Sequence, residues 1–183
     1  MDKNLQSQNF CLKIVLYGPE CSGKTTLAIL LANYYKTQWV PEFAREFLQN
    51  KWDKSKKVCT KEDLPVIVSG QLKLESNQIS RARKYLFCDT NILVTRIWSE
   101  THFDGYCDPE IIKLSEEINY DYYLLTSIDI PWKKDDLRDR PNDRKKMFSY
   151  FKEILDRNKK PYSIINGSIK DRLSSCIKII NNL

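Results

Sequence analysis

The feature that most constrains this chain is the loop at residues 18–25, whose sequence G-P-E-C-S-G-K-T fits the pattern G-x-x-x-x-G-K-[ST] at every fixed position. It follows the apolar run at residues 12–17, which predicts a short buried strand, and it leads into apolar residues at helical spacing over residues 25–32. In this context the glycines let the backbone approach phosphates, and the amides at the helix N-terminus point toward them. The sequence therefore predicts a site for the phosphates of a nucleotide.

The side chains of this loop have expected partners. Lys24 supplies a cation for the terminal phosphates, and the Thr25 hydroxyl is the expected protein ligand of the Mg²⁺ that accompanies ATP. We expect ATP to be the nucleotide cofactor. The residues of the loop that we predict to contact the nucleotide are Gly18, Glu20, Cys21, Ser22, Gly23, Lys24, Thr25 and Thr26.

Length and composition limit the classes of protein to consider. The chain has 183 residues, enough for one substantial core, so we expect a single domain over residues 1–183. Its 30 Lys and Arg residues exceed its 24 Asp and Glu residues, but they are dispersed and lack interleaved aromatics, so we expect no nucleic-acid partner. The six cysteines form no C-x-x-C pair and are expected to be reduced thiols. A polar start at residues 1–6 and the lack of a long apolar run predict a cytoplasmic protein without membrane contact.

Short apolar runs alternate with helical patterns along the rest of the chain. Further strands are predicted at residues 38–40, 85–88, 122–126 and 163–165. Helices are predicted over residues 42–50, from a capping box at residues 60–63 past residue 71, over residues 91–100 and 109–117, and at the end to residue 181. The lysine-rich stretch at residues 51–61 is read as a solvated loop. The alternation predicts an α/β P-loop NTPase fold with a five-stranded parallel sheet, helices on both faces, and ligands at the carboxyl ends of the strands.

Two acidic residues are predicted to stand at strand ends. Glu42 follows the strand at residues 38–40, and Asp89 closes the apolar run at residues 85–88. With Lys24, they should gather at the carboxyl edge of the sheet. Asp89 is the candidate second ligand of Mg²⁺; alternatively it takes a proton from a substrate hydroxyl as general base, a role for which Glu42 is also well placed. In a purely structural alternative, Glu42 and Glu46 cap their own helix or pair with Arg45 on it.

A densely charged segment, residues 132–144, follows the fourth predicted strand. Arginines held over a transferring phosphoryl group neutralise charge that grows in the transition state. We therefore interpret the segment as a mobile lid, with a solvated charged helix as the alternative. The candidate cations are Arg138, which we assign a catalytic role, and Arg140 and Arg144, which we assign to the nucleotide.

Three further motifs accompany the phosphate loop: E-x-x-R-E at residues 42–46, D-T-N at residues 89–91, and W-x-x-D-x-L-R at residues 132–138. In this order they resemble the ribosylnicotinamide kinase domain of NadR-type proteins, over nearly the whole chain. The resemblance implies a nucleoside-kinase-like or adenylate-kinase-like fold with a charged lid. It also implies ATP-dependent phosphorylation of the 5′-hydroxyl of nicotinamide riboside, a small-molecule nucleoside. The residues that it places around that nucleoside are Glu42, Arg45, Asp89, Asn91 and Trp132.

The chain departs from this family in two respects. Members carry a tryptophan directly before the glutamate of E-x-x-R-E, suited to stacking on the nicotinamide ring, whereas this chain has Pro41. Another aromatic residue would have to substitute, and the candidates are Trp98, Trp132 and Tyr106. Full NadR proteins also carry an adenylyltransferase domain with an H-x-G-H signature, which a chain with the single histidine His102 cannot supply. The resemblance therefore concerns the kinase portion.

Two alternatives to this function remain open from the sequence. One is a kinase of another nucleoside or small metabolite, and the other is a regulatory P-loop ATPase that phosphorylates no metabolite. The charged segment favours a kinase, since a lid keeps water from the transferring group. On the adenine side, residues 166–168 and Arg172 are candidate contacts.

Overall fold

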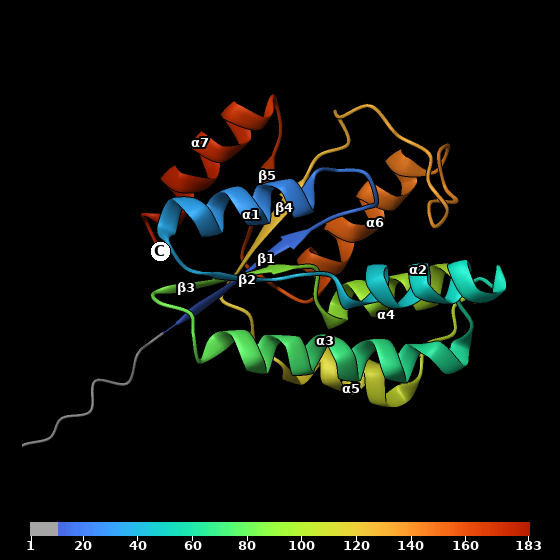
Figure 1. The fold of residues 1–183 in the computed structure, drawn as a ribbon. Coiled ribbons are helices and arrows are strands. Elements are labelled where there is room, and N and C mark those ends of the chain that lie inside the picture. Colours follow the sequence, from blue (N-terminus) through green and yellow to red (C-terminus); the bar gives the residue numbers. More distant parts are fainter. Residues whose placement is uncertain (1–10) are drawn as a thin grey trace, which may run out of the picture.

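Five parallel strands form the centre of the structure, a computed structural model that describes residues 11–183 (Figure 1). The strands are β1 (Leu12–Tyr17), β2 (Gln38–Val40), β3 (Tyr85–Asp89), β4 (Tyr122–Thr126) and β5 (Tyr162–Ile165). They lie in the order β2-β3-β1-β4-β5, and every neighbouring pair is parallel. The predicted fold class is thereby confirmed. The polar stretch at residues 1–6, which contributed to the cytoplasmic prediction, lies outside the described residues.

Helices connect successive strands. They are α1 (Lys24–Tyr35), α2 (Phe43–Ser55), α3 (Leu64–Ile79), α4 (Ile92–His102), α5 (Pro109–Glu117), α6 (Arg144–Arg157) and α7 (Ile169–Ile180). Local side-chain caps fix several of their starts: the Asp108 carboxylate accepts from the Glu110 amide at 2.8 Å, and Ser168 forms a capping box with Asp171. In the part of the chain that the structure describes, no helix is both long and apolar enough to cross a membrane.

The sheet is covered on both faces because alternate residues of its strands point to opposite sides. On β1, Ile14 and Leu16 pack into a core with α1 and α7, whereas Val15 and Tyr17 pack into a second core with α4 and α6. All four of these side chains are fully buried. In Figure 1, α1 and α7 accordingly lie on one side of the strands and α3, α4 and α5 on the other. The loops that follow the strands are left at one edge of the sheet, where the site forms.

The structure corrects the sequence prediction in two segments. The stretch at residues 51–61 is not wholly a loop, because α2 continues to Ser55 before the chain leaves the helix. The capping box at residues 60–63 is present, but it opens a 3-10 turn, Lys61–Asp63, that leads into α3. Helix α6 was not predicted. It begins at Arg144, so the irregular part of the charged segment is limited to residues 132–143, which we call the lid after its predicted role.

Gly70 allows α3 to pack closely against α2. A Cβ at this position would lie 2.3–2.5 Å from three ring atoms of Phe43. Helix propensity alone would make Gly70→Ala stabilising by about 1 kcal/mol. We expect the opposite, a loss of about 1–2 kcal/mol in the free energy of unfolding, because overpacking must displace the Phe43 ring. Urea unfolding of the variant measures the sign directly, and a stabilised variant would contradict this packing.

Candidate nucleotide and acceptor site

The phosphate loop is held in shape by its contacts with the end of β4. Gly18 has φ 136°, and a Cβ there would lie 2.9 Å from the Thr126 hydroxyl and 3.0 Å from its carbonyl oxygen. The buried Ser22 hydroxyl donates to the Pro19 carbonyl at 2.7 Å and lies 2.6 Å from the same Thr126 hydroxyl. Gly23, at φ 85°, forms the N-cap of α1. The loop amides are therefore fixed around the N-terminus of α1, the geometry that phosphate binding requires.

Lys24, Glu42 and Asp89 come together at the carboxyl edge of the sheet, as expected from their places at strand ends. Lys24 Nζ donates to the Pro19 carbonyl at 2.8 Å, and its charge acts on both carboxylates. The Thr25 hydroxyl donates to Asp89 Oδ2. Glu42 immediately precedes α2 and lines the same cavity as the phosphate loop.

Burial controls the ionisation of the two carboxyl groups. It raises the pKa of Glu42 to about 6, and the negative charge of Asp89 adds to this rise, while Lys24, Arg45 and Arg138 oppose it. The pKa of Asp89 is also raised by burial, against the opposing effects of Lys24 and of the hydrogen bond from Thr25. Glu42 therefore exchanges its proton close to neutral pH, a property suited to a general base.

The residues around Asp89 fit a magnesium ion. Asp89 is 1% exposed, and its Oδ1 atom has no hydrogen-bond partner within residues 11–183. A buried, unpartnered carboxylate oxygen next to the Thr25 hydroxyl provides the hard oxygen donors that Mg²⁺ prefers. Residues 11–183 contain no cluster of three or more His, Cys, Asp or Glu side chains arranged to hold a metal. Mg²⁺ beside nucleotide phosphates usually takes one or two protein ligands, and waters and phosphate oxygens complete its shell.

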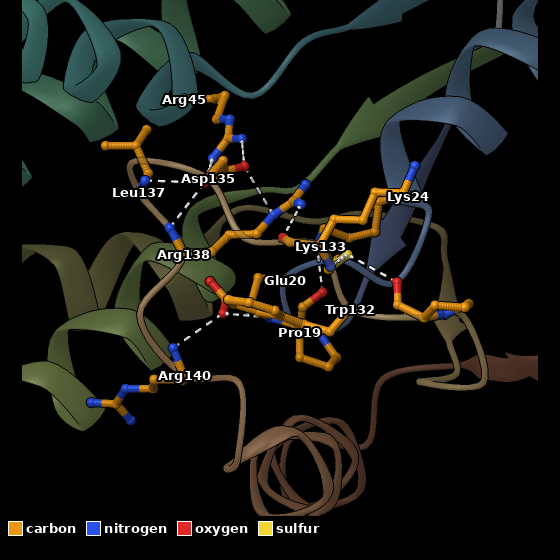
Figure 2. Close-up of polar contacts among 12 residues, drawn as sticks. Pro19, Glu20, Lys24, Arg45, Trp132, Lys133, Asp135, Leu137, Arg138 and Arg140 are labelled. Carbon is orange, nitrogen blue, oxygen red and sulfur yellow. Dashed lines mark hydrogen bonds and ion pairs between the residues drawn. The ribbon is translucent and has the colours of Figure 1, made fainter.

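The lid, residues 132–143, is tied to the phosphate loop through Glu20 (Figure 2). Glu20 Oε1 accepts from Trp132 Nε1 and from the Arg140 amide, both at 3.3 Å. At the far end of the segment, Arg144 donates to the Cys21 carbonyl at 3.2 Å, and its Nε atom is buried without a partner in the described structure. Arg144 thus lies beside the phosphate loop, and its contact with the nucleotide stays a prediction.

The lid is also tied to α2. Asp135 forms ion pairs with Arg45 and, at 3.1 Å, with Arg138, and Figure 2 shows the three side chains meeting. Arg138 also donates to the Lys133 carbonyl at 2.6 Å and lines the cavity. The ion pair of Arg45 is therefore made across the site to the lid. The structural alternative, in which Arg45 pairs with the acidic residues of its own helix, is not what the described structure shows.

Three residues do not lie where the sequence interpretation put them. Asn91 is 1% exposed and is turned into the core. Its side-chain Oδ1 accepts from the Val94 amide and caps α4, and its Nδ2 donates to the Tyr123 hydroxyl, each at 3.3 Å. Thr90, its neighbour, lines the cavity instead. The Arg140 guanidinium donates to the Thr101 carbonyl at 2.5 Å and points away from the phosphate loop in Figure 2. Trp132 contacts Glu20 and is not among the cavity-lining residues.

Arg172 is also placed differently from the expected adenine contact. It is fully buried, and its guanidinium donates to the carbonyls of Ser22, Ser127 and Gly167 at 2.7–3.1 Å and forms an ion pair with Asp129. Every nitrogen of the guanidinium is thus engaged by protein. Arg172 joins the phosphate loop to the loops that follow β4 and β5, and it has a structural role.

We expect Arg172→Met to lower the free energy of unfolding by about 3–5 kcal/mol, because three buried carbonyls lose their donor and an ion pair is broken. Arg157, whose pair with Glu153 is largely exposed, offers a matched control, since Arg157→Met should change stability by less than about 0.5 kcal/mol. Urea unfolding at pH 7 compares the two variants. Equally small losses in the two variants would show that the buried hydrogen bonds and the ion pair of Arg172 contribute little to stability.

One continuous cavity of about 610 Å³ runs from the phosphate loop between α2, α3 and α4 and under the lid. Near the loop it is polar, with Lys24, Glu42 and Arg138 in its wall. Away from the loop, its wall is mostly apolar and aromatic, formed by Leu48, Trp52, Val58, Ile67, Trp98 and Phe103. We call this apolar part of the cavity the acceptor chamber. Of the three aromatic residues considered as substitutes at Pro41, only Trp98 lines it; Tyr106 is 41% exposed and lies under the Lys61 ammonium.

The sequence did not single out Trp52, Phe103 or Gln71, which also line the cavity. They come from α2, from the end of α4 and from α3, so their convergence depends on helix packing. Trp52 lies in the stretch at residues 51–61 that was predicted to be a loop, and no local pattern in the sequence places these three residues on one cavity wall.

The sheet order, the phosphate loop and the carboxylates at the strand ends define a P-loop nucleotide-binding domain. The chain belongs to the AAA domain family, whose sequence profile matches residues 13–172.

Two groups of known proteins are similar to this chain. The trifunctional NAD biosynthesis/regulator protein NadR of Escherichia coli is 24% identical over 177 residues, which cover 95% of this chain and 43% of that protein. The chain thus spans less than half the length of this curated relative. Among solved structures, NadR in complex with NR has a TM-score of 0.73 at 19% identity, over 94% of this chain and 51% of that one. Deoxyadenosine kinase from M. mycoides has a TM-score of 0.68 at 14% identity, over 94% of this chain and 100% of that one. These similarities confirm the resemblance to NadR-type domains and the fold.

Proposed function

We propose that the protein is an ATP-dependent kinase that phosphorylates the 5′-hydroxyl of nicotinamide riboside and yields nicotinamide mononucleotide. The observation that carries this proposal is the continuity of the cavity, in which the phosphate loop, Glu42 and the aromatic acceptor chamber open into one another. Asp89 lines an adjoining pocket, whose wall also includes Thr25 and Glu42. A nucleotide on the loop and a flat nucleoside in the chamber would meet at Glu42 and Asp89. The similarity to NadR bound to NR supports this choice of acceptor.

In the proposed reaction, the 5′-oxygen of the riboside attacks the γ-phosphorus of ATP, and the bond to the oxygen bridging the β- and γ-phosphates breaks. Glu42 accepts the hydroxyl proton, since its raised pKa of about 6 leaves it ionised at neutral pH yet basic enough to take a proton. Lys24 and Arg138 neutralise the charge on the phosphates and on the leaving group. Mg²⁺ bound by Thr25 and Asp89 would supply further neutralisation of the phosphate charge.

The lid supports transfer to an acceptor over hydrolysis. Its ties to α2 through Asp135 and to the phosphate loop through Glu20 hold it against the cavity, whose wall includes Leu137 and Arg138. Exclusion of water strengthens the electrostatic interactions inside the site and suppresses attack by water. A regulatory ATPase has no need of the acceptor chamber. Because the fold is also similar to that of deoxyadenosine kinase, other nucleosides are the second class of candidate acceptor.

The test is ADP release in the presence of ATP, Mg²⁺ and a panel of nucleosides that includes nicotinamide riboside, deoxyadenosine and thymidine. Mass analysis identifies the phosphorylated product. We expect nicotinamide mononucleotide to form in step with ADP. A different phosphorylated nucleoside would replace the acceptor in this proposal, and ADP without a phosphorylated acceptor would favour the regulatory ATPase.

A further inference from the structure

Gln71 places a buried side-chain amide in the wall of the acceptor chamber. It lies in the middle of α3, is 3% exposed and lines the cavity. Its Oε1 atom accepts from the Phe43 amide at 2.9 Å, which fixes the orientation of the side-chain amide. The Nε2 atom consequently lies on the other side, and it has no hydrogen-bond partner within residues 11–183.

Glu75 lies one helical turn further along α3, close to this amide. Both of its carboxylate oxygens accept from the buried Tyr120 hydroxyl, at 2.8 and 3.0 Å. The pKa of Glu75 is raised by burial and is lowered in part by Tyr120, by Lys13 and by the nearby Gln71 amide. The Glu75 carboxylate therefore favours the orientation in which Nε2, and not Oε1, is turned toward it, although no hydrogen bond joins the two groups in the described structure. Both N–H groups of Nε2 remain to be satisfied.

A buried donor without a partner costs free energy, and native structures leave few such groups. In a ligand cavity with apolar walls, the few polar groups set the orientation and the specificity of the ligand. Trp52, Trp98 and Phe103 provide flat apolar surface for a ring in the chamber, and Gln71 adds a donor at its wall. The ring that fits this chamber carries a hydrogen-bond acceptor.

We propose that Gln71 determines specificity by donating from Nε2 to a carbonyl oxygen on the ring of the phosphoryl acceptor. This inference rests on the proposed function and deepens it. For nicotinamide riboside, the oxygen is that of the carboxamide. The fixed orientation of the Gln71 amide, set by the Phe43 amide and Glu75, then selects rings with an acceptor at that position over rings that lack one.

The experiment compares nicotinamide riboside with a pyridinium riboside that lacks the carboxamide, in the wild type, in Gln71→Met and in Gln78→Met. Gln78 is the matched control, because it lies on the same helix, also has an amide atom without a partner, and is not among the cavity-lining residues. We expect the wild type and Gln78→Met to favour nicotinamide riboside in kcat/KM by roughly 10- to 100-fold. Gln71→Met should lose most of that preference while keeping its KM for ATP.

Binding of each riboside, followed by quenching of tryptophan fluorescence, separates this inference from the proposed function. If neither riboside is phosphorylated but the binding preference is present in the wild type and lost in Gln71→Met, the assigned reaction is wrong and the role of Gln71 stands. If nicotinamide riboside is phosphorylated and Gln71→Met keeps the wild-type preference in both kcat/KM and binding, the role of Gln71 is wrong and the kinase stands. Absence of any preference in the wild type also overturns the role of Gln71.

Discussion

Replacement of Lys24 by alanine is expected to lower kcat for phosphoryl transfer by about 1,000-fold or more, by analogy with the loss of a single group that stabilises transition-state charge. Lys24 is at the first position of α1 and reaches the site where the terminal phosphates are expected. Its hydrogen bond in the structure is to the Pro19 carbonyl of the loop itself, at 2.8 Å. Release of this bond would free the ammonium group to bind the nucleotide. We therefore expect the substitution to lower kcat.

Thermal unfolding serves as the control for Lys24→Ala, because the side chain is only partly buried and its removal should leave the fold intact. Lys24→Arg keeps the charge and should recover part of the activity. An alanine variant with near-normal transfer would contradict the assignment of this loop to the nucleotide phosphates.

The second large effect is expected for Glu42→Gln, which keeps the shape of the side chain and removes the base. We expect kcat to fall by about 100- to 10,000-fold. In the wild type, activity should rise with pH through about 6, since burial raises the pKa of Glu42 to that value and only the ionised form accepts a proton. This rise should be absent from the residual activity of the variant.

Glu117→Gln provides the comparison, because Glu117 is an exposed carboxylate at the end of α5 and lines neither of the two pockets that contain Glu42. It should keep the wild-type pH profile and a rate within about threefold, as surface changes usually do. A Glu42→Gln variant that retains both the rate and the pH-dependent rise would assign the base elsewhere, with Asp89 as the next candidate.

Much of the nucleotide side of the site could be predicted from the sequence, because it follows from strand ends. Lys24 and Thr25 come after β1, Glu42 after β2 and Asp89 at the end of β3, and in a parallel sheet these positions meet at one edge. The position of each residue directly after a strand was enough to predict that they lie close together. The same reasoning gave the strand boundaries, which were marked by short apolar runs.

The acceptor chamber could not be predicted in this way. Trp52, Trp98 and Gln71 belong to three different helices, and their meeting depends on packing, such as the close approach of α2 and α3 at Gly70. An arginine in a helical pattern reads as a surface residue, so the full burial of Arg172 could not be inferred without the loops that converge on it.

Other errors came from signals that the sequence did contain. The buried residues Met147, Phe151, Ile154 and Leu155 recur at helical spacing and predict α6, but the charge of the preceding segment drew the interpretation toward a lid. Asn91 stands directly before an apolar helical pattern, where an asparagine is a favoured N-cap. Because Asn91 belongs to the D-T-N motif, it was instead predicted to contact the substrate.

The most direct test of the central claim, that this cavity transfers a phosphoryl group to a nucleoside, is the fate of water oxygen. The reaction is run with ATP, Mg²⁺ and nicotinamide riboside in water enriched in ¹⁸O, and both the mononucleotide and the inorganic phosphate are analysed by mass. The proposed mechanism predicts that nicotinamide mononucleotide accounts for the ADP formed and carries no oxygen from water. Inorganic phosphate that contains one water-derived oxygen and accounts for all the ADP would contradict it, and would identify the protein as an ATPase.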